Sequence, residues 1–147
     1  MSHTIKKQMN LPQSRERVWE AIANREALAD WMHPNDFEPR VGHRFTFQVP
    51  GNPAVGFAGL TVNCEVLECA PPRLLVFSWS AGGPVANTRV SFRLEPEGDG
   101  TRLVFEHSGF DLSQPFGDQA FKGADYGWSK MLNQLSSLLT ARSTQSQ

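Results

Sequence analysis

The sequence predicts a single α+β domain in which a curved antiparallel sheet wraps around one long C-terminal helix. Between residues 42 and 109, apolar and polar side chains alternate in five short runs, which is the period of half-buried strands. Beyond residue 117, the apolar residues follow the helical period instead. A sheet with one apolar face and a helix with one apolar stripe bury both surfaces by packing together.

The first 32 residues predict a strand followed by two short helices. A mixed segment at residues 3–10 ends at a proline, after which Ser14 is suited to cap a helix. Asn24 is suited to cap a second helix in the same way. Core packing is the simplest role for Trp19. Trp31 is a candidate for a binding site because it precedes a loop that contains two prolines.

Five alternating runs predict the strands that follow, and one wet face on each favours an antiparallel sheet. Breaks at residues 50–53, 70–73, 82–84 and 97–100 are rich in glycine and proline and suit hairpins. Cys64 and Cys69 have an odd spacing in one run, which predicts opposite faces and two reduced thiols. The predicted inward-facing aromatic residues are Phe45, Phe47, Phe77, Trp79, Phe92 and Phe105.

The C-terminal segment predicts a long helix that starts near Asp118 as its N-cap. Gly123 and Gly127 interrupt its first half, each at a cost of about 1 kcal/mol relative to alanine. Such glycines permit close packing, a bend, or mobility near an opening. Residues 143–147 have no apolar side chain, so we predict a domain over residues 1–142 and a disordered tail.

Composition and charge exclude some classes of function. Fourteen basic and fifteen acidic residues give a formal charge of −1, which provides no positive field for nucleic acid. No apolar run is long enough for a membrane span or a secretory signal, so we expect a cytoplasmic protein.

No familiar catalytic, phosphate-binding or metal-binding pattern is present, so no catalytic residue, metal or cofactor is predicted. His107 shares a strand face with Leu103 and Phe105, where it could contact a ligand or act as a general acid or base. The simpler alternative is a hydrogen bond from His107 to the loop at residues 108–113. His33 either guards an entrance or is an exposed loop residue.

Five ordered stretches of the chain resemble one known family. They lie at residues 17–32, 42–47, 65–79, 100–110 and 127–135, and include Leu28-Ala29-Asp30-Trp31-Met32, Ala70-Pro71-Pro72-Arg73 and Gly127-Trp128. They resemble START-related proteins of the SRPBCC superfamily, specifically those similar to the C-terminal domain of the activator of heat-shock protein 90 ATPase. The resemblance implies a helix-grip fold with about six strands and raises the expectation of a cavity for a hydrophobic ligand. It does not decide function, because one fold serves many functions.

We therefore expect a domain that holds a small apolar or aromatic molecule between the sheet and the C-terminal helix, with no catalysis assigned. Asp125 and Tyr126 are further candidates for the mouth of the pocket, although solvent exposure is the simpler reading of Asp125. The candidate lining residues are Trp31, Phe47, Trp79, Phe92, His107, Phe121, Trp128 and Met131.

Two alternatives to this function stay open. The first is a co-chaperone-like domain that modulates a heat-shock protein 90 ATPase, with a chaperone as partner and a role in stress response. The second is a cyclase or hydrolase that uses a pocket histidine. An exposed strand edge or helix face would also allow a two-fold homodimer.

Overall fold

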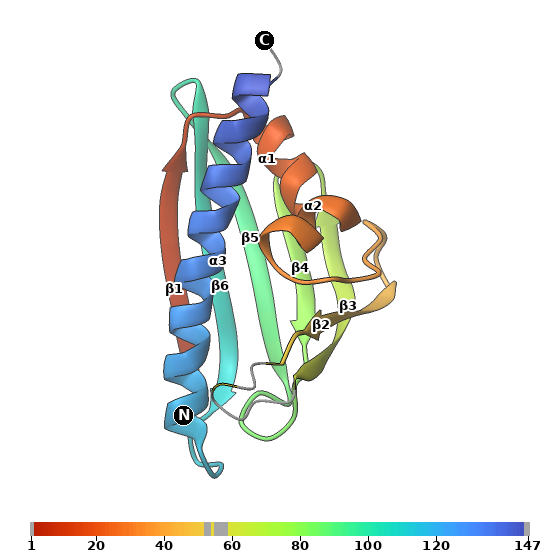
Figure 1. The fold of residues 1–147 in the computed structure, drawn as a ribbon, viewed down its shortest axis with the longest axis vertical. Coiled ribbons are helices and arrows are strands. Elements are labelled where there is room, and N and C mark those ends of the chain that lie inside the picture. Colours follow the sequence, from red (N-terminus) through yellow and green to blue (C-terminus); the bar gives the residue numbers. More distant parts are fainter. Residues whose placement is uncertain (1, 52–53, 55–58, 146–147) are drawn as a thin grey trace.

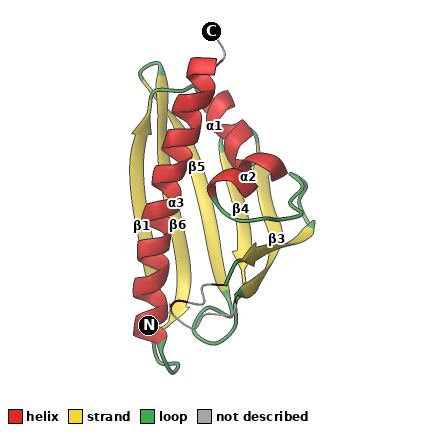
Figure 2. Cartoon of the chain, viewed as in Figure 1, coloured by secondary structure: helices red, strands yellow, loops and turns green. Residues whose placement is uncertain are grey.

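The elements of the protein follow the predicted order of one strand, two short helices, five strands and a long helix (Figure 2). The structure is a computed structural model that describes residues 2–51, 54 and 59–145. The elements are β1 (Ser2–Leu11), α1 (Arg15–Ile22), α2 (Arg25–Trp31), β2 (Arg44–Val49), β3 (Leu60–Ala70), β4 (Leu74–Trp79), β5 (Thr88–Glu97), β6 (Gly100–Asp111) and α3 (Gly117–Gln145). The tail predicted for residues 143–147 lies partly outside the described residues, and α3 continues to Gln145.

The strands form one sheet in the order β1-β6-β5-β4-β3-β2, and each neighbouring pair is antiparallel. Helix α3 runs along one face of this sheet, and α1 and α2 cover the same face beside it (Figure 1). This arrangement is the helix-grip fold, so the predicted fold class is confirmed. The three helices cover the apolar face of the sheet, because neither the sheet nor the helices could bury their apolar side chains alone.

Both predicted caps of the short helices are present. The Ser14 hydroxyl accepts from the amide of Arg17 at 3.4 Å, and the Asn24 side chain accepts from the amide of Ala27 at 3.0 Å. Each cap satisfies an amide that has no partner within its helix.

Helix α3 starts one residue earlier than the predicted cap. It begins at Gly117, so Asp118 lies in the first turn rather than at the N-cap. A Cβ atom on Gly117 would lie 2.7 Å from the Cα atom of Leu112, and only glycine allows this close approach. The helix therefore begins where the preceding loop folds back against it.

The prediction that Cys64 and Cys69 lie on opposite faces of the sheet was wrong. The register of β3 and β4 shifts between Val66 and Glu68, which marks a β-bulge or similar irregularity. An extra residue reverses the alternation beyond it. Cys69 then pairs with the fully buried Leu75 and packs against the core, on the same side as Cys64. Both cysteines are free thiols.

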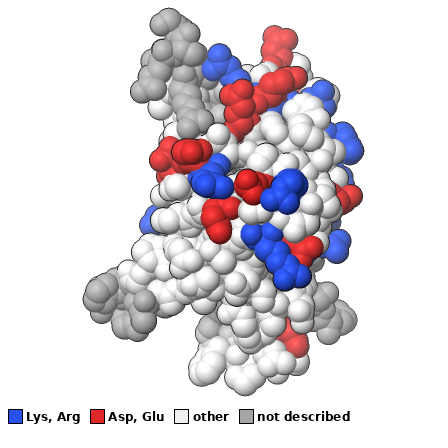
Figure 3. All heavy atoms as spheres, turned by 90° about the vertical axis from the view of Figure 1, so that its right-hand side faces the viewer, with Lys and Arg blue, Asp and Glu red and all other residues white. Residues whose placement is uncertain are grey.

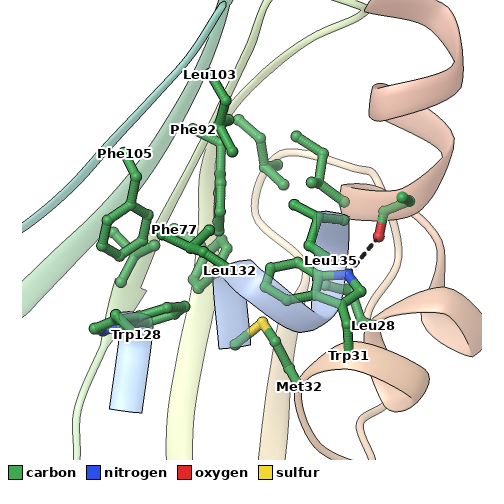
Figure 4. Packing of buried hydrophobic residues seen from close by; sticks show 14 of the residues in the cluster. Leu28, Trp31, Met32, Phe77, Phe92, Leu103, Phe105, Trp128, Leu132 and Leu135 are labelled. Atoms are coloured by element: carbon green, nitrogen blue, oxygen red, sulfur yellow. Dashed lines mark hydrogen bonds between the residues drawn. The ribbon is translucent and has the colours of Figure 1, made fainter. Parts of the chain in front are cut away.

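One half of the core, beside α1 and α2, is filled by side chains (Figure 4). The indole N–H of Trp31 donates to the carbonyl of Ala21 at 2.8 Å, and its ring meets Phe92 edge-on at 6.1 Å. Leu28 and Leu135 pack in the same cluster and are fully buried. This packing fixes α2 against the sheet and against the C-terminal half of α3.

Candidate functional site

The other half of the core leaves a space beside α3. A cavity of about 450 Å³ lies beneath the N-terminal half of α3. Its lining combines small residues of α3 with apolar residues from the strands and their connections. The lining residues are His33, Val49, Leu60, Trp79, Ala81, Val85, His107, Ala120, Gly123, Ala124, Gly127, Trp128 and Met131.

Small side chains on α3 explain why this half is open. Ala120, Gly123, Ala124 and Gly127 recur at three- and four-residue spacing, so they share one side of the helix. Apart from the chain neighbours and the adjacent backbone of the helix itself, a Cβ atom added to Gly123 or Gly127 would meet no atom within 4 Å. The helix thus presents little side-chain volume where the sheet curves away from it.

The structure brings four of the eight predicted lining residues together at the cavity, namely Trp79, His107, Trp128 and Met131. The other four lie elsewhere: Trp31, Phe47 and Phe92 are fully buried in the cluster of packed side chains, and Phe121 is half-buried with its ring 5.2 Å from Phe110.

Two further candidates for the mouth do not reach the cavity. Asp125 pairs instead with Lys7 of β1, with 2.8 Å between the Lys7 ammonium and the carboxylate. Tyr126 is 73% exposed on the outer side of α3. Neither residue lines the cavity.

Sequence reasoning did not place the small residues of the wall or the connecting segments in the lining. The spacing of Ala120, Gly123, Ala124 and Gly127 was the available signal, because small residues on one helical face leave space against a partner layer. Ala81 and Val85 lie in the connection between β4 and β5, and no sequence pattern places that connection at the cavity.

The inner wall of the cavity is formed by three aromatic side chains in mutual contact. The ring centroids of Trp79 and Trp128 are 5.3 Å apart, and His107 lies 5.6 Å from Trp79 and 5.9 Å from Trp128. Trp128 also packs on Phe105, with 4.4 Å between ring centroids. These contacts connect the cavity wall to the filled core.

A directional chain of hydrogen bonds runs through this wall. The indole N–H of Trp128 donates to Nδ1 of His107 at 2.9 Å, so Nδ1 must carry a lone pair. The proton of the neutral ring is then on Nε2, which lies 2.8 Å from the Thr88 hydroxyl and donates to it. Thr88 in turn donates to the carbonyl of Trp79. Each donor in the chain therefore has an acceptor.

This network leaves His107 poorly suited to acid–base catalysis. Burial lowers the pKa of His107 to about 3, because the charged imidazolium would lose its hydration. Both ring nitrogens already have partners in Trp128 and Thr88. The hydrogen bond predicted from His107 to residues 108–113 is replaced by these two contacts, which join β6 to β5 and to α3.

The lining contains no lysine, arginine, aspartate or glutamate among the described residues. The connection between β4 and β5, residues 80–87, also carries no charged side chain. Figure 3 shows that charged groups of both signs gather on the upper part of the face at the β2 edge, and that its lower part carries few. The electrostatic environment of the cavity favours uncharged molecules.

Residues 2–51, 54 and 59–145 contain no group of three or more His, Cys, Asp or Glu side chains that could hold a metal ion. Within the same residues, no helix has both the length and the apolar character needed to cross a membrane.

A family model described as "Activator of Hsp90 ATPase homolog 1-like protein" matches residues 12–140, which is most of the chain. The chain belongs to this family. The match confirms the resemblance noted from the sequence. No curated protein matches the chain significantly.

Solved structures similar to this family member agree on the fold. Protein MLL2253 from Mesorhizobium loti is 29% identical, with a TM-score of 0.83 over 95% of this chain and 98% of that chain. Protein BH1534 from Bacillus halodurans is 27% identical, with a TM-score of 0.74 over 93% and 96%. An Aha1 dimer from Colwellia psychrerythraea has a TM-score of 0.75 at 19% identity over 93% and 96%, a likeness of fold alone.

In this member of the Activator of Hsp90 ATPase homolog 1-like family, the cavity thus lies at one end of a helix-grip fold, between α3 and the curved sheet. Its polar side chains include two histidines, one with both ring nitrogens hydrogen-bonded and one just after the end of α2.

Proposed function

We propose that this protein binds a small, largely apolar molecule in the cavity beneath α3. The observation that carries the proposal is the cavity itself, about 450 Å³ with an apolar and aromatic lining. Ligand sites typically have volumes of about 300–1,000 Å³ and a similar lining. A binding role also accounts for Gly123 and Gly127, which weaken the helix but keep the space open.

The proposal can be tested with N-phenyl-1-naphthylamine, an uncharged dye that becomes more fluorescent in apolar surroundings. We expect saturable binding to the wild-type protein. In the Gly127→Leu variant the added side chain occupies the cavity, so dye binding should weaken at least about 10-fold, since a filled site excludes the ligand.

Gln119→Leu is the matched control, because Gln119 is exposed on the same helix and lines neither this cavity nor the apolar groove at Met9, Leu103 and Leu132. It should bind the dye as the wild type does. Equal weakening in both variants, or no saturable binding to the wild type, would contradict the proposal. If the wild type binds the dye and the control behaves as expected, native mass spectrometry of the purified protein would identify any molecule that the folded chain retains.

A second candidate function is modulation of a chaperone ATPase, and the description of the matching family model favours it. The test adds the purified protein to an Hsp90 homologue and measures the rate of ATP hydrolysis. A change that persists in the Gly127→Leu variant would support a surface interaction independent of the cavity. No change in the rate at saturating protein would remove this candidate.

A further inference from the structure

His33 is the histidine of the cavity lining whose ring lacks a hydrogen-bond partner among the described residues. Its ring has no hydrogen bond to any residue that the structure describes, and only its carbonyl accepts, from the Asn35 side chain at 3.1 Å. The ring is half-buried, and burial lowers its pKa, so the neutral form predominates near pH 7. A neutral imidazole offers one donor and one acceptor.

The backbone around His33 is held firmly in place. The amide of Met32 donates to the carbonyl of Leu28 at 2.8 Å, which closes the end of α2. The amide of Gln48 in β2 donates to the carbonyl of Pro34 at 2.9 Å. The side chain of His33 thus extends from a segment tied on both sides to the helix and the sheet, which limits the entropy lost when it binds a ligand.

Several other polar groups of the lining are already paired. His107 uses both ring nitrogens, and the amide of Ala81 donates to the carbonyl of Val85 at 2.9 Å. Val49 and Leu60 are paired across β2 and β3. The indole N–H of Trp79 has no hydrogen bond to a described residue either, but it offers a donor alone. A group that needs both a donor and an acceptor would therefore find them together at His33.

We propose that His33 is the recognition point for a single uncharged hydroxyl group on an otherwise apolar ligand. A hydroxyl both donates and accepts, so it matches the two nitrogens of the neutral ring. A carboxylate fits less well, because no cationic side chain lines the cavity among the described residues and burial of an unpaired charge is costly. This inference rests on the proposed binding function and adds the chemical class of the ligand.

The experiment compares 2-naphthol with 2-methylnaphthalene, which has a methyl group in place of the hydroxyl. Each compound competes with N-phenyl-1-naphthylamine on the wild type, on His33→Phe, and on His33→Gln, which keeps a donor and an acceptor. For each protein, the dissociation constant of 2-naphthol is divided by that of 2-methylnaphthalene. Comparing this ratio between variants cancels the difference in hydrophobicity between the two compounds.

In His33→Phe, the dissociation constant of 2-naphthol should rise by about 2- to 10-fold relative to that of 2-methylnaphthalene. This factor corresponds to the loss of one hydrogen bond. His33→Gln should retain part of the preference. His43→Phe is the control, because His43 is also half-buried but does not line the cavity, and it should leave the ratio unchanged.

The outcomes separate this inference from the function on which it rests. If both compounds bind the wild type and His33→Phe leaves the ratio unchanged, the role of His33 is overturned and the cavity proposal stands. If neither compound nor the dye binds the wild type, both fall. Tighter binding of 2-naphthoate than of 2-naphthol would overturn the assignment of an uncharged ligand.

A second measurement does not depend on the folding of any variant. In wild-type protein with ¹⁵N-labelled histidine, the ring nitrogens of His33 should shift on addition of 2-naphthol and stay nearly unchanged with 2-methylnaphthalene. Equal shifts with the two compounds would contradict a hydrogen bond to the ring.

Discussion

At Trp128, the packing of the core and the polar network of the cavity wall meet in one side chain. Its ring lies against Phe105 and Trp79, while its N–H donates to His107. The residue is 1% exposed. The indole therefore contributes both buried apolar area and the donor that fixes the tautomer of His107.

Replacement of Trp128 by phenylalanine should show the value of that donor. Trp128→Phe keeps an aromatic ring but leaves Nδ1 of His107 as a buried acceptor without a partner. Together with the smaller ring, this should lower the free energy of unfolding by about 1–3 kcal/mol. Urea denaturation measures the change. Tyr126→Phe, on the exposed side of the same helix, should leave the midpoint unchanged; an equal loss in both variants would contradict the role of the hydrogen bond.

The buried His107 also predicts how stability depends on pH. In the unfolded chain it titrates near 6.5, whereas burial lowers the folded pKa to about 3. Between these values the unfolded state binds more protons, so stability falls as the pH falls. The loss from this residue between pH 7 and pH 5 should be about 2 kcal/mol.

Urea denaturation at the two pH values checks this expectation against the variant His107→Gln. Glutamine can accept from Trp128 and donate to Thr88 but does not titrate. Between pH 7 and pH 5, the free energy of unfolding of the wild type should fall by about 2 kcal/mol more than that of the variant. Burial also lowers the pKa of His33, but His33 contributes equally to both proteins. Equal losses would show that His107 is not buried as a neutral ring.

At the scale of elements, α3 contains glycines with opposite structural requirements. Gly127 faces open space, so Gly127→Ala should raise the free energy of unfolding by about 1 kcal/mol through helix propensity. Gly117→Ala should lower it, because the new Cβ would lie 2.7 Å from Leu112 Cα and 2.9 Å from the carbonyl oxygen of Asp111. Thermal unfolding of the pair measures both signs. Destabilisation by Gly127→Ala would contradict an open cavity at that position.

The strands show how far a sequence pattern predicts a site. Alternation placed Phe47, Trp79 and Phe92 on the inner face, and all of them are buried there. Alternation does not specify where along the curved sheet α3 loses contact with the strands. It therefore could not distinguish Trp79, which lines the cavity, from Phe92, which is packed in the core.

A pattern of period two also does not predict the register between strands or the irregularities within them. The irregularity between Val66 and Glu68 reversed the alternation that predicted opposite faces for Cys64 and Cys69. The pairing of His107 with Thr88 depends on the register between β5 and β6, which aligns Val90 with His107. Both features arise from the pairing of one strand with its neighbour in the sheet, so neither follows from the pattern of one strand alone.

At the scale of the whole molecule, α3 lies over two different surfaces. Its C-terminal half packs Leu132, Leu135 and Leu139 into the filled core, and each is at most 5% exposed. Its N-terminal half covers the cavity with alanine and glycine. Because local stability follows buried contacts, the two halves should differ in their rates of opening.

Amide hydrogen exchange followed by mass spectrometry tests this difference. In the free protein, residues 118–131 should exchange faster than residues 132–141, because fewer packed side chains hold the first segment against the sheet. A bound apolar molecule would supply the missing contacts, so 2-naphthol at saturation should slow exchange mainly in residues 118–131. In Gly127→Leu, the free protein should already show this slower exchange and respond little to the compound. Equal exchange in both segments, or protection confined to residues 132–141, would mean that the cavity neither loosens α3 nor receives the ligand.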